Sequence, residues 1–65
     1  MKSLIDFFID YEQGLLSERE TLEFFSELIS TNMAWRLQGH YGRTAINLIE
    51  SGCLDKKGKI LVDIE

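Results

Sequence analysis

Residues 17–30 read SERETLEFFSELIS, and this stretch does the most to decide the fold. Ser17 and Glu20 form the pattern of a capping box, in which each side chain accepts a hydrogen bond from the backbone amide of the other residue. Apolar residues then recur at helical spacing. They are Leu22, Phe25, Leu28 and Ile29, with Phe24 beside them. The stretch therefore predicts a helix that begins after Ser17 and ends at positions 30–32, which hold the poor helix formers Ser, Thr and Asn.

A second helix is predicted upstream, over residues 3–12, where acidic residues interrupt an apolar run at a spacing closer to a helix than to a strand. Ser3 is its expected N-cap. Gly14 is its expected end, because glycine adopts the left-handed conformation of a helix terminus without steric cost. Since the interval between the two helices is short, we expect them to form a helical hairpin.

The second half of the chain predicts a short helix from about Met33, a break near Gly39, and a longer helix from about His40 to Ser51 that Gly52 ends. Residues 55–59 are polar, contain a glycine and predict a turn. Residues 60–64 are β-branched and partly alternating. They form either one short strand, whose pairing partner could come from a second copy of the chain, or an extended tail that lies on the helices.

The fold class expected from these elements is all-α, in a single domain that spans residues 1–65. The predicted architecture is a compact bundle of three to four short helices with an extended or short-strand C-terminal tail. Its expected core consists of Leu4, Phe7, Phe8, Leu22, Phe25, Leu28, Trp35, Leu37, Tyr41, Ala45, Leu48 and Ile49. Ile5, Ile9, Phe24 and the 60–64 tail add more apolar surface than so small a core absorbs, which predicts a homo-oligomer.

The composition, 45% hydrophobic and 28% charged over 65 residues, is that of a globular domain at a size where the core is marginal. Small folds often rely on a disulfide or a metal ion. Cys53 is the only cysteine and His40 the only histidine, so we expect no internal disulfide, no metal site and no cofactor. These two side chains also offer little from which to build a nucleophile and its base, and the chain contains no Walker, zinc or dinucleotide-binding motif. We therefore expect no enzymatic activity.

The expected location is the cytoplasm. Residues 1–10 lack the charged start and uninterrupted apolar stretch of a signal peptide. No run of about 18 apolar residues could span a membrane. A lone thiol also fits a reducing compartment better than a secreted scaffold.

Charge is divided unevenly along the chain. Residues 1–32 carry two basic and seven acidic side chains, a net charge of −5, whereas residues 33–65 carry five basic and four acidic ones, a net charge of +1. An acidic face is often only a solvated face. The alternative is a contact surface for a basic patch on another protein, with Glu20, Glu23 and Glu27 as its candidate residues. The overall charge of −4 argues against DNA binding, which we rank last although a helix–turn–strand order over residues 33–64 would suit it.

An unusual stretch, WRLQGHYGRTA at residues 35–45, gathers rings, guanidinium groups and an amide. One interpretation is a site for an anionic ligand such as a nucleotide, with phosphate held by Arg43 and the free amides at a helix start, a base stacked on Tyr41 or Trp35, and Gln38 or His40 reading its edge. The candidate residues are Arg36, Gln38, His40, Tyr41, Arg43 and Thr44. The other interpretation, to which we give more weight, is packing: Trp35, Leu37 and Tyr41 fill the core, and the two glycines allow close helix crossing.

The same stretch, followed by LIESG at residues 48–52, resembles a group of short phage-encoded proteins of unassigned function. In that group an acidic helical hairpin, with a beginning like IDYEQGLLSERET at residues 9–21, precedes the segment with the glycines and arginine. The resemblance covers about residues 5–54 and implies no particular activity. It implies a small protein expressed in an infected bacterium, where short chains often block, redirect or sequester a host component. Two functions are therefore expected: inhibition or modulation of a host protein, or sequestration of a nucleotide or another anion at the Gly39–Thr44 segment.

Overall fold

The computed structural model describes residues 3–37 and 39–62 of the chain. Its first helix, α1 (Leu4–Glu12), is capped by Ser3, whose hydroxyl accepts a hydrogen bond from the Asp6 amide at 3.3 Å. Gln13 is the C-cap of the helix, and Gly14 follows in the left-handed conformation with φ of 71°. The predicted start and end of the first helix are both confirmed.

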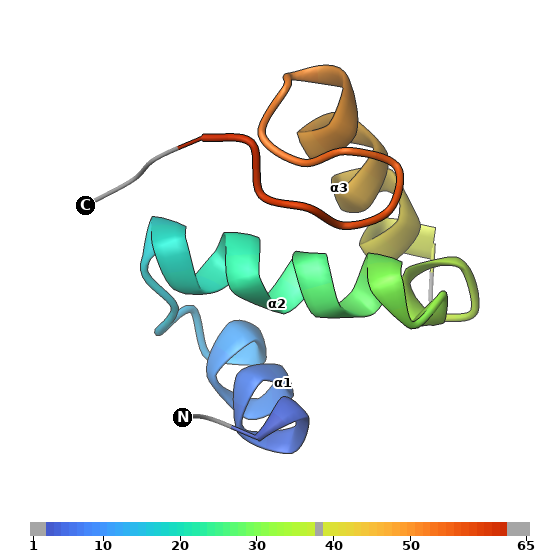
Figure 1. Cartoon of the computed structure of the whole chain (residues 1–65). Coiled ribbons are helices and arrows are strands. Elements are labelled where there is room, and N and C mark those ends of the chain that lie inside the picture. The colour runs from blue at the N-terminus through green and yellow to red at the C-terminus, as the bar shows by residue number, and fades with distance from the viewer. Residues whose placement is uncertain (1–2, 38, 63–65) are drawn as a thin grey trace.

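The second helix, α2 (Glu18–Ser30), begins with the predicted capping box. The Ser17 side chain accepts from the Glu20 amide, and the Glu20 carboxylate accepts from the Ser17 amide, both at 3.1 Å. A loop of five residues, 13–17, joins the first two helices. This loop brings α1 back against α2, as the predicted hairpin requires (Figure 1).

A short 3₁₀ helix, η1 (Met33–Trp35), and the longer helix α3 (Gly39–Glu50) follow, so the predicted break near Gly39 is confirmed, although α3 already includes Gly39. Gly52 ends the last helix with φ of 85°. Gly42 lies where α3 passes close to η1. A Cβ atom at position 42 would lie 3.4 Å from the Ala34 carbonyl oxygen, so the two segments are in close contact at this crossing.

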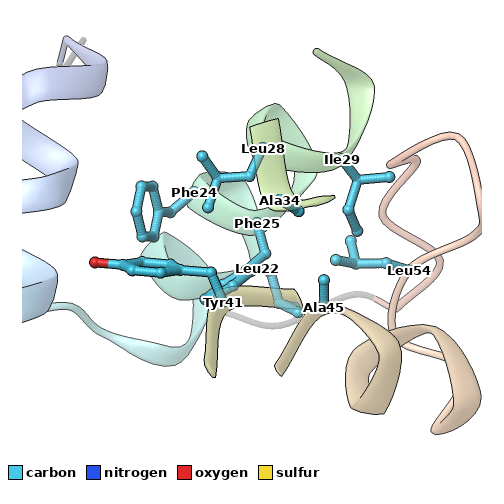
Figure 2. Close-up of a cluster of buried hydrophobic side chains, with 9 residues drawn as sticks. All are labelled: Leu22, Phe24, Phe25, Leu28, Ile29, Ala34, Tyr41, Ala45 and Leu54. Atoms are coloured by element: carbon cyan, nitrogen blue, oxygen red, sulfur yellow. The ribbon is translucent and has the colours of Figure 1, made fainter. Parts of the chain in front are cut away.

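The core forms around α2, which runs through the middle of the molecule with α1 on one side and α3 and the C-terminal segment on the other (Figure 1). Side chains from α2, η1, α3 and the C-terminal segment meet in it (Figure 2). The buried hydrophobic residues are Leu22, Phe24, Phe25, Leu28, Ile29, Ala34, Tyr41, Ala45 and Leu54. The all-α bundle predicted from the sequence is confirmed.

The predicted burial of two residues was wrong. Phe24, counted as surplus surface, is fully buried, because its ring contacts those of Phe7, Phe8 and Tyr11 on α1. Trp35, predicted in the core, is 47% exposed at the end of η1. The sequence placed Phe24 by the periodicity of one helix face, whereas α2 is in fact covered from two sides.

The C-terminal segment, residues 53–62, folds over α2 through the predicted turn. The Asp55 carboxylate accepts hydrogen bonds from the amides of Lys57 and Lys59, both at 2.8 Å. Gly58 is buried against α2, where the Ser26 hydroxyl donates to its carbonyl oxygen. An isolated antiparallel bridge between Leu54 and Ile60 is the only strand-like pairing among the described residues. Residues 63–65, the end of the predicted tail, lie outside the described residues.

Candidate functional site

A half-open groove of about 890 Å³ crosses the exposed face of α2. Its lining residues come from α1, α2 and the C-terminal segment, which lie side by side in Figure 1. They are Leu4, Asp6, Phe7, Glu20, Glu23, Ser26, Glu27 and Ile60. All three glutamates that the sequence proposed as partner-binding residues are among them.

Helical geometry explains why the glutamates gather here. Glu20, Glu23 and Glu27 are spaced i, i+3 and i+7, so they form one stripe along a single face of α2. The packing of α1 puts Leu4, Asp6 and Phe7 along the stripe on its side of α2, and the C-terminal segment contributes Ile60. We call this surface the acidic groove: a stripe of carboxylates with apolar side chains next to it.

The polar residues of the acidic groove take part in different hydrogen bonds and ion pairs. Glu20 closes the capping box of α2, so its carboxylate is needed for the helix start. Glu23 forms an exposed ion pair with Arg19 at 3.6 Å, and Ser26 is bonded to Gly58. Glu27 is exposed, and its backbone carbonyl accepts from the hydroxyls of Ser30 and Thr31. Of the three groove glutamates, Glu23 and Glu27 are therefore the two whose side chains do not cap a helix.

The charged residues that line the groove all have the same sign. Four of its eight lining residues are acidic and none is basic, so the groove concentrates negative potential. Among the described residues, no group of three or more histidine, cysteine, aspartate or glutamate side chains is arranged to hold a metal ion. The chemistry available to the groove is ion pairing with a cation combined with burial of apolar surface.

The second set of predicted site residues, around the start of α3, is split between surface and core. Arg36, His40 and Arg43 are exposed and Thr44 is half-buried, while Gln38 lies outside the described residues. The Arg43 guanidinium lies back over Gly39, close enough that a Cβ atom there would be 3.4 Å from it. Arg43 is thus an exposed cation beside the first turn of α3.

Tyr41 departs from its predicted role as a residue that stacks on a base. Its ring is buried in the core, and its hydroxyl points toward α1, where it donates to the Glu12 carboxylate at 2.5 Å (Figure 2). Burial, followed by the hydrogen bond to Glu12, raises the pKa of Tyr41 to about 12. Tyr41 thus joins α3 to α1, and of the two rings proposed to stack on a base, Trp35 is the exposed one.

Sequence reasoning missed most of the groove outside α2. Leu4 and Phe7 had been assigned to the core, whereas each is half-buried and also lines the groove. Asp6 and Ile60 carried no local signal, since their role depends on which segments pack beside α2.

Comparison with known proteins identifies a family. The family model for a domain of unknown function, DUF7417, matches residues 1–64. The chain belongs to this family. No curated protein and no solved structure is detectably similar to this DUF7417 chain. None of the helices in its described residues is both long and apolar enough to cross a membrane.

Proposed function

We propose that this DUF7417 protein is a non-catalytic phage accessory protein that binds a host protein through the acidic groove and thereby inhibits or modulates it in the host cytoplasm. The observation that supports this proposal is the groove itself. Glu20, Glu23 and Glu27 line it together with Asp6 and with apolar side chains from two other segments. The phage context is supported by the resemblance of residues 35–45 to short phage-encoded proteins.

The charge distribution suits rapid capture of a basic partner. Residues 1–32 have a net charge of −5, and the groove lies mostly on this half of the chain. A negative field of this kind attracts a positive patch over distances of about a Debye length, or ~8 Å at physiological ionic strength. The association rate should therefore fall as salt concentration rises, while the apolar lining sustains the complex once it has formed.

Affinity capture from bacterial lysate, with mass spectrometry of the retained proteins, tests the proposal. The informative variant is the double substitution Glu23→Gln and Glu27→Gln, because Glu20 must remain to cap α2. The matched control is Glu18→Gln with Glu50→Gln, which removes the same charge at exposed positions outside the groove. We expect the control to retain the same host protein as the wild type and the groove variant to lose it. Retention that is equal for both variants contradicts the proposal.

The exposed group at the start of α3 supports a second candidate function, sequestration of a nucleotide or another anion. Trp35 is exposed beside Gly42, and Arg36 and Arg43 are exposed in the same part of the chain. Calorimetry against a panel of nucleotides, cyclic dinucleotides included, tests it. A true site should lose affinity on Arg43→Ala while the melting temperature of the free protein stays unchanged. The packing interpretation predicts no binding and a lower melting temperature.

A further inference from the structure

We propose that the acidic groove holds a helical segment of the partner, one that presents a stripe of arginine or lysine side chains with apolar residues on both sides of the stripe. This inference rests on the proposed function and adds the chemistry and conformation of the bound segment. It follows from the arrangement of charges, from the apolar lining, and from the distribution of basic residues in the chain itself.

The carboxylates set the length and the charge of the bound segment. Glu20 and Glu27 lie seven residues apart on α2, which is about 10 Å along the helix axis, or about two turns. A partner helix alongside α2 repeats this spacing with basic residues at i, i+4 and i+7. Its cations would face the glutamates, and Asp6 on α1 adds a fourth carboxylate beside them.

Because part of the groove lining is apolar, the bound segment needs apolar residues as well as positive charge. Leu4 and Phe7 contribute apolar surface from α1, and Ile60, which is 37% exposed, contributes it from the C-terminal segment. A purely basic segment would leave this surface in contact with water. On a helix, apolar residues can flank a basic stripe on both sides, whereas an extended strand turns every second side chain away from the surface. An amphipathic helix therefore fits the lateral arrangement of the groove better than a strand does.

A second copy of this chain does not supply such a helix. In its described helices, α1 has no lysine or arginine, α2 has only Arg19 and α3 has only Arg43. The three lysines at positions 56, 57 and 59 belong to the turn that folds over α2, not to a helix. The groove thus lacks a complementary helix within its own chain, and the occupant is a different protein.

Fluorescence anisotropy with three labelled, alanine-based peptides of about 14 residues, roughly four helical turns, tests the inference on the intact protein. The first peptide has arginines in one stripe with leucines on both sides. The second replaces the leucines by glutamine, and the third replaces the arginines by glutamine. We expect the first peptide to bind, and the other two to bind at least about tenfold more weakly, because each lacks one of the two contacts.

Variants of the protein locate the binding. Ile60→Ser should weaken the first peptide about fivefold and leave the second unchanged, because only the first has leucines to contact that position. Leu61→Ser is the matched control, since Leu61 is exposed and adjacent but does not line the groove. Glu23→Gln with Glu27→Gln should weaken the first and second peptides about tenfold. Circular dichroism of each variant confirms that the fold is retained.

Two results overturn the inference: equal affinity for the first and second peptides, or an Ile60→Ser variant that binds the first peptide as the wild type does. Failure of the two proposals is distinguishable. If a host protein is captured through Glu23 and Glu27 but the first peptide does not bind, the amphipathic helix is the wrong occupant and the proposed function stands. If capture does not depend on these glutamates, the proposed function fails.

Discussion

Gly58 offers the sharpest test of how the C-terminal segment is held on α2. Its φ of 93° is one that L-residues rarely adopt, and a Cβ atom would lie 2.5 Å from the Ser26 carbonyl oxygen and 3.1 Å from the Ser30 nitrogen. Both neighbours are backbone atoms of α2, so they cannot turn aside as a flexible side chain could. Gly58→Ala must therefore strain the turn, displace the segment, or do both.

The expected cost has two parts. A non-glycine residue in the left-handed region costs about 1 to 2 kcal/mol, and overpacking against a fixed neighbour costs about 1 to 3 kcal/mol. Gly58→Ala should thus lower the free energy of unfolding by about 2 to 5 kcal/mol. For a chain of this size, whose total stability is on the order of 3 to 10 kcal/mol, that loss is a large fraction. Displacement of the segment would also move Ile60 out of the acidic groove.

Gly52→Ala is the matched control, because Gly52 has φ of 85° and nothing within 4 Å of its Cβ position. Gly52→Ala should therefore show only the free-energy cost of a non-glycine residue in the left-handed conformation. Urea unfolding followed by circular dichroism measures both variants, and the difference between them isolates the clash with α2. If Gly58→Ala and Gly52→Ala lose the same stability, the close packing of residue 58 on α2 is not what holds the segment, and the reasoning is refuted.

Three further predictions concern the core, the raised pKa of Tyr41 and self-association. Phe25→Ala should lower the free energy of unfolding by about 3 to 5 kcal/mol, because Phe25 is fully buried. The helical circular dichroism signal should then be largely lost. A variant that keeps the cooperative unfolding transition of the wild type would contradict this prediction. Tyr41 keeps its proton to a pKa of about 12 when folded, against 10.0 for the ordinary side chain, so folding should lose stability as pH rises from about 10 through 12. Tyr41→Phe should be less stable than the wild type at neutral pH but should lack this share of the alkaline loss. Identical alkaline profiles of unfolding would contradict the raised pKa of Tyr41. The chain should self-associate through exposed Ile5 and Ile9, which are 70% and 50% exposed, and light scattering that gives a 7.5 kDa monomer at high micromolar concentration would contradict this.

The sequence by itself determined the local structure of the chain. The Ser3 cap, the Ser17–Glu20 capping box and the left-handed Gly14 and Gly52 were predictable, because each depends on contacts within a few residues of backbone. The turn at residues 55–59 was predictable for the same reason. Helical spacing also indicated which residues share a face, and from that the all-α class and most of the core followed.

Only the tertiary structure decided which faces meet. Periodicity gives the direction of a side chain around its own helix, but it leaves open the angle and side at which the next segment packs. Phe24 is buried because α1 covers its flank of α2, whereas Trp35 stays exposed at the end of η1. Tyr41 and Glu12, 29 residues apart, meet for the same reason. The acidic groove also depends on the tertiary structure. Its glutamate stripe is a property of one helix. Its apolar lining exists because α1 and the C-terminal segment both pack beside α2, which brings Phe7 and Ile60 to the same surface.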